Sequence, residues 1–335
     1  MEKILTVSIA AYNVEETLGR ALDPLICIKS IVDKIEIIIE NDGSKDRTQE
    51  IAEEYKAKYP DSIIVNNKQN GGYGSTINES IELATGKYFK QLDGDDWFDT
   101  ASFQMFIDFL EKCNSDLVYS PHYVIKQEKE TEKKTLIDLF DDVYLNKTIN
   151  LICDAIPGDI GMHGLAIKTE LLKNNNVRIS EKCFYTDFEY VFYPFVLAET
   201  LSIFKSPVYN YLLGREGQSV SLAGEKKHYN DRIQVFMRTA EYYEENQKNI
   251  TKNKRDFLGK KIANLAGDMY NSILLVVEGY KQKELFERID GKVKAQFPTV
   301  YKETNRRKSV AYLRKRRFSV WSRAIVKQRI KSRYM

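Results

Sequence analysis

The stretch Lys87-Tyr-Phe-Lys-Gln-Leu-Asp-Gly-Asp-Asp-Trp-Phe98 joins a short apolar run to three carboxylates. The run predicts a buried strand, and Asp93, Asp95 and Asp96 follow that strand directly. Clustered carboxylates repel one another, so a cation commonly stabilises them. Mg²⁺ or Mn²⁺ suits one or two carboxylates together with substrate phosphates. The alternative is an acidic turn in which Asp96 or Asp99 caps the following helix.

Apolar runs and amphipathic stretches alternate in the first third of the chain. The runs predict strands over residues 4–11, 34–40, 62–66 and 87–92, and the stretches predict helices over residues 16–31, 46–59 and 72–84. This alternation predicts an α/β fold with a doubly wound, mostly parallel sheet. In such sheets, ligands gather outside the carboxyl ends of the strands. Three polar clusters follow predicted strands and should converge in space: Tyr12-Asn13, Asn41 to Ser44, and Asp93 to Asp96.

The composition is that of an ordinary globular protein, with 43% hydrophobic and 30% charged residues, which excludes a disordered or fibrous chain. The four cysteines are scattered and form no C-x-x-C pair. This disfavours a zinc site or a disulfide framework and fits a reducing cytosol. The first apolar run is too short, and too close to acidic Glu2, for a signal peptide or a membrane span. We therefore expect a cytoplasmic protein.

Charge is distributed very unevenly along the chain. The net charge is only +3, but residues 306–333 contain twelve lysines and arginines and no acid, so the rest of the chain carries about −9. The apolar residues of this segment are predicted to share one helical face: Val310, Leu313, Val320, Trp321, Ala324 and Ile325. A basic amphipathic helix with a tryptophan favours an anionic membrane surface, here the inner face of the cell membrane. Packing on the acidic body and contacts in a homo-oligomer are the alternatives. Nucleic acid is not expected, because no recognition module is present.

The segments Thr6–Leu18, Glu36–Thr48 and Ala84–Trp97 occur in a characteristic order and spacing. Together with Phe184–Tyr190 they resemble the family 2 glycosyltransferases, which have the type-A glycosyltransferase fold. The resemblance covers about residues 3–221. It implies an inverting, metal-dependent hexosyltransferase that moves a sugar from a UDP-linked donor to a glycan, lipid-linked or protein-linked acceptor. Such enzymes act in surface polysaccharide or glycoprotein biosynthesis. The alternative is a catalytically silent relative that binds another transferase or a glycan.

The resemblance also implies roles for residues after the first two strands. In the family, the first of these segments lines the nucleobase pocket, which points to Ala11, Tyr12 and Asn13. The acid before Gly-Ser binds the uracil, which points to Asp42, although Asn41 stands where the family often has another aspartate. Turn chemistry is the alternative for Asn13 and Asp42, because their side chains can bond neighbouring backbone amides.

The family's D-x-D motif corresponds to Asp93-Gly94-Asp95. Its first aspartate lies near the ribose in the family, so Asp93 and Gly94 are assigned to donor binding. Its last aspartate binds the metal, so Asp95 is the predicted ligand of Mn²⁺ or Mg²⁺, with Asp96 as an assisting carboxylate or a cap. The glycine-rich segment 70–78 fails the dinucleotide fingerprint at Ile77, which disfavours a dehydrogenase. Many relatives have an arginine at this position, so a usual donor contact is absent.

An inverting transfer needs a general base that takes the proton of the acceptor hydroxyl. In the family this base is the last acid of a Glu-Asp pair, and the matching residue is Asp187, with Thr186 in place of the glutamate. A helix N-cap is the alternative for Asp187, and Glu189 is the second candidate for the base. His163, which lies among glycines, is either an acceptor or diphosphate contact or a structural histidine. Arg215 is either a diphosphate or acceptor contact or a surface charge.

These assignments divide the chain into three predicted parts. Residues 1–221 form the catalytic domain, with a nucleotide-binding half over 1–98 and an acceptor half over 99–221. Residues 222–300 form a helical region, and residues 301–335 form the basic amphipathic tail.

Overall fold

The computed structural model describes residues 2–128, 131–145, 147–156, 158–214, 222–248 and 250–331. The chain divides into two compact units. The first unit comprises Met1–Lys182 and Thr186–Arg215, and the second comprises Cys183–Tyr185 and Glu216–Met335. Each unit has its own core, and the two are described separately.

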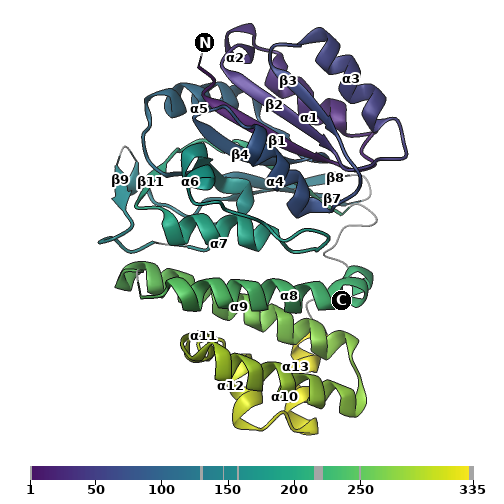
Figure 1. Cartoon of the computed structure of the whole chain (residues 1–335), viewed down its shortest axis with the longest axis vertical. Coiled ribbons are helices and arrows are strands. Elements are labelled where there is room, and N and C mark those ends of the chain that lie inside the picture. Colours follow the sequence, from purple (N-terminus) through teal and green to yellow (C-terminus); the bar gives the residue numbers. More distant parts are fainter. Residues whose placement is uncertain are drawn as a thin grey trace. The chain divides into compact units, whose positions relative to one another are not determined.

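An eight-stranded sheet forms the centre of the first unit, in the order β3-β2-β1-β4-β10-β6-β11-β9 (Figure 1). Its strands are β1 (Leu5–Ala11), β2 (Ile35–Asn41), β3 (Ile63–Asn67), β4 (Tyr88–Asp93), β6 (Leu117–Tyr119), β9 (Thr148–Asn150), β10 (Leu165–Lys168) and β11 (Thr200–Ile203). β1 runs parallel to both β2 and β4, and β2 runs parallel to β3. β10 runs antiparallel to β4 and β6, and β9 runs antiparallel to β11. The predicted mostly parallel α/β sheet is confirmed.

A second sheet, in the order β5-β12-β7-β8, completes this unit. Its strands are β5 (Trp97–Phe98), β12 (Tyr209–Leu213), β7 (His122–Glu128) and β8 (Thr131–Ile137). β7 and β8 pair antiparallel, from His122 opposite Ile137 to Glu128 opposite Thr131. β12 pairs with β5, which follows the acidic stretch directly. This pairing places β12 beside the aspartates.

Helices cover both faces of the large sheet. The helices are α1 (Leu18–Ile26), α2 (Lys29–Val32), α3 (Thr48–Lys58), α4 (Tyr73–Leu83), α5 (Thr100–Lys112), α6 (Thr169–Asn174) and α7 (Asp187–Leu197). The buried side chains of Leu5, Val7 and Ile9 pack in one core with α1, α3 and α5. On the other face, the Ser8 hydroxyl donates to the Ser80 hydroxyl of α4 over 2.9 Å. The predicted helix over 16–31 is two helices, because Ile28 between them has extended backbone angles.

The second unit is a bundle built around α9. Its helices are α8 (Leu222–Asn246), α9 (Lys252–Val276), α10 (Gly279–Gln296), α11 (Pro298–Thr304), α12 (Lys308–Lys315) and α13 (Val320–Lys331). α9 contacts each of the other five helices. Its buried residues Ile262, Ala266, Met269 and Ile273 recur every three or four positions, as expected for one helix face that packs against neighbours. The predicted C-terminal helical region is confirmed.

The segment Cys183–Tyr185 belongs to this second unit. The Phe184 ring stacks on the His228 ring at a centroid distance of 3.6 Å. The Arg232 guanidinium lies 3.6 Å from the centroid of the Tyr185 ring, an attractive cation–π geometry. Two side chains of α8, those of His228 and Arg232, thus hold a segment that lies well before the bundle in the sequence.

The apolar residues that the sequence placed on one helical face of the basic tail lie on two separate helices, α12 and α13. That detail of the prediction is wrong. Arg317 and Phe318 both have a φ of 48°, and this left-handed turn separates α12 from α13. Val310 and Leu313 of α12 are fully buried. By contrast, the predicted partners on α13 are exposed: Val320 at 68%, Trp321 at 81% and Ile325 at 40%. Two residues of the predicted apolar face, Val310 and Leu313, therefore belong to the core, and the four on α13 lie at the surface.

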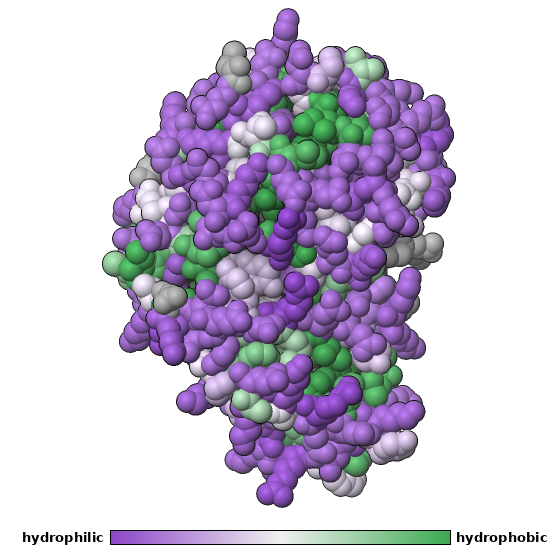
Figure 2. Space-filling view, in the orientation of Figure 1, coloured by the Kyte–Doolittle hydropathy of each residue, from purple (hydrophilic) through white to green (hydrophobic). Residues whose placement is uncertain are grey.

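The surface drawn in Figure 2 is mostly hydrophilic, and its hydrophobic residues gather in separate patches. Among the described residues, none of the helices combines the length and the apolar character needed to cross a bilayer.

Replacing the buried leucine of α12 should destabilise the protein. We expect Leu313→Ala to lower the free energy of unfolding by about 2–5 kcal/mol, because it removes buried methyl groups and leaves a cavity. Trp321→Ala is the matched control, since that side chain is exposed. Urea unfolding followed by circular dichroism measures both. Equal stabilities of the two variants would contradict the packing of α12 in the core.

Candidate active site

The carboxyl ends of β1, β2 and β4 meet at one edge of the large sheet. Ala11 pairs with Asn41 across β1 and β2, and Ala10 pairs with Asp93 across β1 and β4. The three polar clusters that follow these strands therefore converge, as parallel pairing requires. This edge holds most of the predicted site residues.

The loop after β1 is held to the loop after β2 by hydrogen bonds. Asn13 has a φ of 52°, a left-handed value that asparagine tolerates better than most residues. Its Oδ1 accepts a hydrogen bond from the Lys45 amide over 2.8 Å, and its own amide donates to Ser44 Oγ over 3.0 Å. Ala11 is buried, whereas the Tyr12 ring is 51% exposed beside them. Donor binding by these residues stays a prediction.

Asp42 organises the glycine-rich turn before α4. Its Oδ1 accepts hydrogen bonds from Lys68 Nζ (2.9 Å) and the Gly71 amide (2.8 Å), and its Oδ2 accepts one from the Gly72 amide (2.9 Å). The residue is only 3% exposed. The turn chemistry considered from the sequence is therefore present, and the predicted uracil contact stays a prediction. Lys68, which follows β3, is a partner that the sequence did not point to.

The acidic turn after β4 is buried and hydrogen-bonded. Asp93 Oδ1 accepts a hydrogen bond from the Tyr73 hydroxyl over 2.7 Å. Asp96 is fully buried; its Oδ2 accepts from the Tyr209 hydroxyl (2.6 Å) and its Oδ1 from the Leu212 amide (2.7 Å). Asp96 thus fastens the turn to β12. Asp99, rather than Asp96, caps α5, because its side chain accepts from the Ser102 amide.

Gly94 and Asp95 lie against β1 and α1. The Gly94 amide donates to the Ala10 carbonyl over 3.0 Å, and a Cβ at Gly94 would lie only 2.8 Å from that oxygen. Only glycine allows the turn to approach β1 so closely. The Asp95 carbonyl accepts a hydrogen bond from Arg20 over 2.8 Å, and its side chain is partly exposed.

His163 lies beside the aspartates, although it is 70 residues away from Asp93 in the sequence. The ligand atoms of Asp93, Asp96 and His163 lie within 4.8 Å of one another. The His163 ring stacks on the Tyr211 ring at a centroid distance of 4.1 Å. Nζ of Lys90, a residue of β4, donates to the His163 carbonyl over 2.8 Å and so ties the backbone at His163 to the large sheet.

Burial and neighbouring charges shift the pKa values of the cluster. Burial, followed by the charges of Asp95 and Asp187, raises the pKa of Asp93 to about 7. Burial also raises the pKa of Asp96, and the neighbouring charges of Asp93 and Asp95 raise it further. Burial, with His122 and Lys90 nearby, lowers the pKa of His163 to about 3, so its ring is neutral at physiological pH. Two carboxylates and a neutral imidazole form a donor set that suits Mn²⁺ or Mg²⁺, with Mn²⁺ better matched to the imidazole.

Asp187 is the first residue of α7, and it is exposed. Its charge contributes to the raised pKa values of Asp93, Tyr73 and Tyr211, which places the carboxylate near all three. Thr186 occupies the N-cap position but forms no side-chain cap hydrogen bond. Asp187 therefore lies near the acidic cluster, and Thr186 rather than Asp187 is at the N-cap position of α7.

Glu189, the second candidate for the base, has a structural role. It is fully buried, and it accepts hydrogen bonds from the Ser180 amide (2.6 Å) and hydroxyl (2.8 Å). Asn78 of α4 bonds both the amide and the carbonyl of Ile179. A Cβ at Gly74 would come within 1.9 Å of the Ser180 carbonyl oxygen, so α4 touches this segment directly. The backbone at Ile179 and Ser180, which precedes Asp187, is therefore fixed by contacts with Gly74, Asn78 and Glu189.

Residues 6–172 match the family described as Glycosyl transferase family 2. The chain belongs to this family.

Two curated relatives of this glycosyltransferase come from Bacillus. The Minor teichoic acid biosynthesis protein GgaB of Bacillus subtilis (strain 168) is 29% identical over 180 residues, which are 53% of this chain and 19% of that protein. The Poly(ribitol-phosphate) beta-glucosyltransferase of Bacillus spizizenii is 24% identical over 221 residues, which are 65% of this chain and 34% of that protein. The glycosyltransferase thus matches less than half the length of either relative.

Two solved structures share the fold. The structure of S. aureus TarS 1–349 in complex with UDP-GlcNAc matches with a TM-score of 0.53 at 16% identity, over 93% of this chain and 92% of that one. The mannosyltransferase PcManGT from Pyrobaculum calidifontis, in complex with GDP-Man and Mn²⁺, matches with a TM-score of 0.51 at 12% identity, over 98% of this chain and 88% of that one. The type-A glycosyltransferase fold predicted from the sequence is confirmed.

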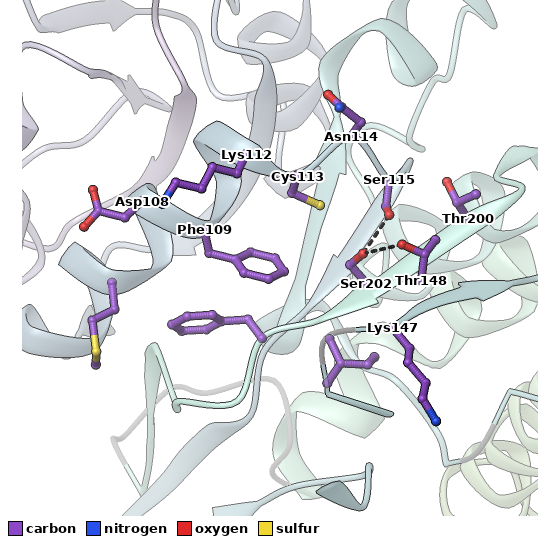
Figure 3. Close-up of a pocket in the computed structure, with 13 residues that line it drawn as sticks. Asp108, Phe109, Lys112, Cys113, Asn114, Ser115, Lys147, Thr148, Thr200 and Ser202 are labelled. Carbon is purple, nitrogen blue, oxygen red and sulfur yellow. Dashed lines mark hydrogen bonds between the residues drawn. The ribbon is translucent and has the colours of Figure 1, made fainter. Parts of the chain in front are cut away.

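A separate cavity of about 790 Å³ in the same unit contains none of the predicted site residues. Figure 3 shows three hydroxyls that converge there, from Ser115, Ser202 and Thr148. Ser115 precedes β6 and Thr200 begins β11, so the cavity starts at the amino ends of strands that run parallel to each other. β6 also runs in the direction of β4, because β10 is antiparallel to both. The cavity therefore opens at the end of the sheet away from the aspartates.

Several residues of the site belong to none of the motifs that predicted it. Tyr73, Tyr209 and Tyr211 lie around the carboxylates, and burial raises the pKa of each hydroxyl. Tyr209 and Tyr211 are two residues apart, a spacing that puts both side chains on one face of a strand and could have pointed to the pair. Arg215, the remaining candidate, lies outside the described residues.

Mn²⁺ binding should depend on pH through Asp93. Because the pKa of Asp93 is raised to about 7, its carboxyl is protonated below that pH, and a metal must displace the proton. We expect the affinity for Mn²⁺ to rise about tenfold between pH 6 and pH 8, measured by calorimetry. Asp93→Asn should bind Mn²⁺ more weakly and lose this part of the dependence. A wild-type affinity for Mn²⁺ that does not change between pH 6 and pH 8 would contradict binding of the ion by Asp93.

Proposed function

We propose that the protein is an inverting glycosyltransferase that transfers a sugar from a UDP-linked donor to an acceptor hydroxyl in bacterial surface glycan biosynthesis. The observation that carries this proposal is the meeting of Asp93, Asp96 and His163 with Asp187 at the carboxyl edge of the sheet. Family membership supplies the reaction class, and the geometry supplies the groups that the reaction needs.

The donor is proposed to lie across the ends of β1, β2 and β4. Tyr12 offers an exposed ring on which a nucleobase can stack. Ala11, Asn13 and Asp42 border the same position, and Asp93 with Gly94 lies towards the ribose. The UDP-GlcNAc complex of the structural neighbour TarS supports a UDP-linked donor.

The proposed chemistry is a single displacement. Asp187 takes the proton of the acceptor hydroxyl, the oxygen attacks the anomeric carbon, and the bond from that carbon to the donor phosphate breaks on the opposite face. The product is inverted at the anomeric carbon, and UDP leaves with its added negative charge. A general base of this kind contributes about 10²- to 10⁴-fold in rate.

Asp95, assisted by Asp96, is proposed to hold Mn²⁺ or Mg²⁺. The ligand atoms of Asp93 and His163 lie within 4.8 Å of those of Asp96, so these two residues are further candidate ligands. A bound divalent ion would neutralise the charge that develops on the leaving diphosphate. Support comes from the donor set and from the Mn²⁺ complex of the structural neighbour PcManGT.

The acceptor is proposed to be a surface glycan that carries phosphate. Two relatives support this proposal: one is a minor teichoic acid biosynthesis protein, and the other is a poly(ribitol-phosphate) beta-glucosyltransferase. A lipid-linked or protein-linked glycan is the broader alternative. The expectation of a homo-oligomer stays a prediction.

Attachment to the inner face of the cell membrane is proposed for α13, in a cytoplasmic protein. Val320, Trp321 and Ile325 are exposed on a helix that also carries lysines and arginines, and a surface of this kind suits an anionic bilayer.

Removal of the proposed base should abolish transfer. We expect Asp187→Asn to lower the rate of UDP release from a UDP-sugar by about 10²-fold or more, with little change in the Michaelis constant for the donor. Asp108→Asn is the control, because this aspartate is exposed on α5 away from the cluster. Wild-type rates in Asp187→Asn would contradict the role of the base. If the wild-type protein releases no UDP from any UDP-sugar with Mn²⁺, the catalytically silent alternative is favoured instead.

The membrane proposal predicts a specific loss of binding. Trp321→Ala should weaken binding to phosphatidylglycerol vesicles about tenfold, because it removes the largest exposed apolar side chain of α13. Met105→Ser is the control, since this residue is an exposed apolar side chain of α5. Vesicle flotation measures the bound fraction. Equal binding of both variants and the wild type would contradict attachment through α13.

A further inference from the structure

A cavity in the helical unit is lined by a cluster of cations. It has a volume of about 780 Å³ and lies between α9, α13 and the start of α12. Five of its lining side chains are cationic: Lys260, Arg306, Arg307, Lys308 and Arg329. Among the residues that line it, none is an aspartate or a glutamate. The cavity, termed here the cationic groove, therefore concentrates positive charge on a concave surface.

Ion pairs inside the bundle involve some of these cations and not others. Arg306 is paired with Asp256 over 3.0 Å and with Glu303 over 2.6 Å. In the part of the chain that the structure describes, no carboxylate forms an ion pair with Arg307 or Lys308. The charge of the whole unit adds to the effect, because residues 222–331 contain 27 lysines and arginines against 12 aspartates and glutamates. The groove thus has a positive potential available for a ligand.

A glycine in α9 sets the position of Arg307. A Cβ at Gly267 would lie only 2.7 Å from Nε of Arg307, so the guanidinium rests where a side chain would otherwise stand. Arg307 is half-buried as a result. A guanidinium fixed in this way loses less freedom when it binds an anion than a mobile surface arginine does.

The groove is longer than a single anionic group. Lys260, Asn264 and Asn271 line it along one side of α9. Their eleven-residue span corresponds to about 16 Å of helix. Asn264, Asn271 and Tyr312 also add neutral hydrogen-bond donors. A ligand that fills this length would carry more than one anionic group.

We propose that the cationic groove binds a chain that carries phosphate groups at intervals, such as a phosphodiester-linked polyol. Guanidinium and ammonium groups match phosphate oxygens in charge and hydrogen bonding. A lipid surface is less favoured, because the exposed Val320 and Trp321 do not line the groove. RNA is less favoured because bases need stacking platforms, and Tyr312 is the one aromatic residue among those that line it. The inference rests on the proposed function in one respect, since it gives the acceptor chain a second binding site.

The test measures binding without turnover. A fluorescent oligomer of ribitol phosphate is titrated with the full chain in EDTA, with no donor present, and its anisotropy is followed at several salt concentrations. The test variant is Lys260→Gln with Lys308→Gln, both exposed residues of the groove. The matched control is Lys226→Gln with Lys227→Gln, which removes the same charge from exposed positions on α8.

We expect the test variant to bind the oligomer at least about fivefold more weakly than the wild type and the control. The slope of log affinity against log salt should fall by about one for each cation removed, the size found for phosphate contacts. Unchanged melting temperatures would show that the variants are folded.

Three outcomes would overturn the proposal: equal binding by the test variant and the wild type, tighter groove-dependent binding of an RNA oligomer, or tighter groove-dependent binding of phosphatidylglycerol vesicles. Groove-dependent binding of the oligomer in a protein that transfers no sugar would count against the proposed function alone and would support the groove.

Discussion

The hydrogen bonds that Asp96 accepts from Tyr209 and Leu212 join the two sheets of the catalytic unit. Asp96 follows the last strand of the parallel half, and its partners belong to β12 in the second sheet. Burying a carboxylate costs free energy unless it is hydrogen-bonded. Separating the two sheets would remove these hydrogen bonds from Asp96, so they help to hold the sheets together. The pairing of β5 with β12 and the hydrogen bond from the Asp93 amide to the Tyr209 hydroxyl reinforce this connection beside Asp93.

The same burial gives the site its electrostatic character. Acidic side chains that are close together and removed from water favour their neutral forms, which explains the raised pKa values of Asp93 and Asp96. Such a cluster attracts a cation more strongly than solvated carboxylates would. The low pKa of His163 has the same origin and keeps the imidazole available as a neutral ligand. Perturbed acids in one place are typical of functional sites.

The sequence predicted the parallel sheet and its functional edge, because buried strands appear as apolar runs and their carboxyl ends converge by a topological rule. Asp187 was assigned only through the family resemblance, since nothing local distinguishes it from a helix cap. The partnership of Asp96 with Tyr209 could not be predicted, because a contact between residues 113 positions apart leaves no local pattern. The split of the tail at Arg317 and Phe318 was missed for another reason: neither residue type normally marks a left-handed turn.

The segment Cys183–Tyr185 gives the chain a limited modularity. It packs within the helical unit, yet it ends two residues before Asp187. An attempt to shorten the protein to its catalytic unit would leave Phe184 and Tyr185 without His228 and Arg232, and would loosen the entry to α7. The helical unit is consequently not a detachable appendage, and exchange of this unit between related enzymes would have to preserve the anchoring of those three residues.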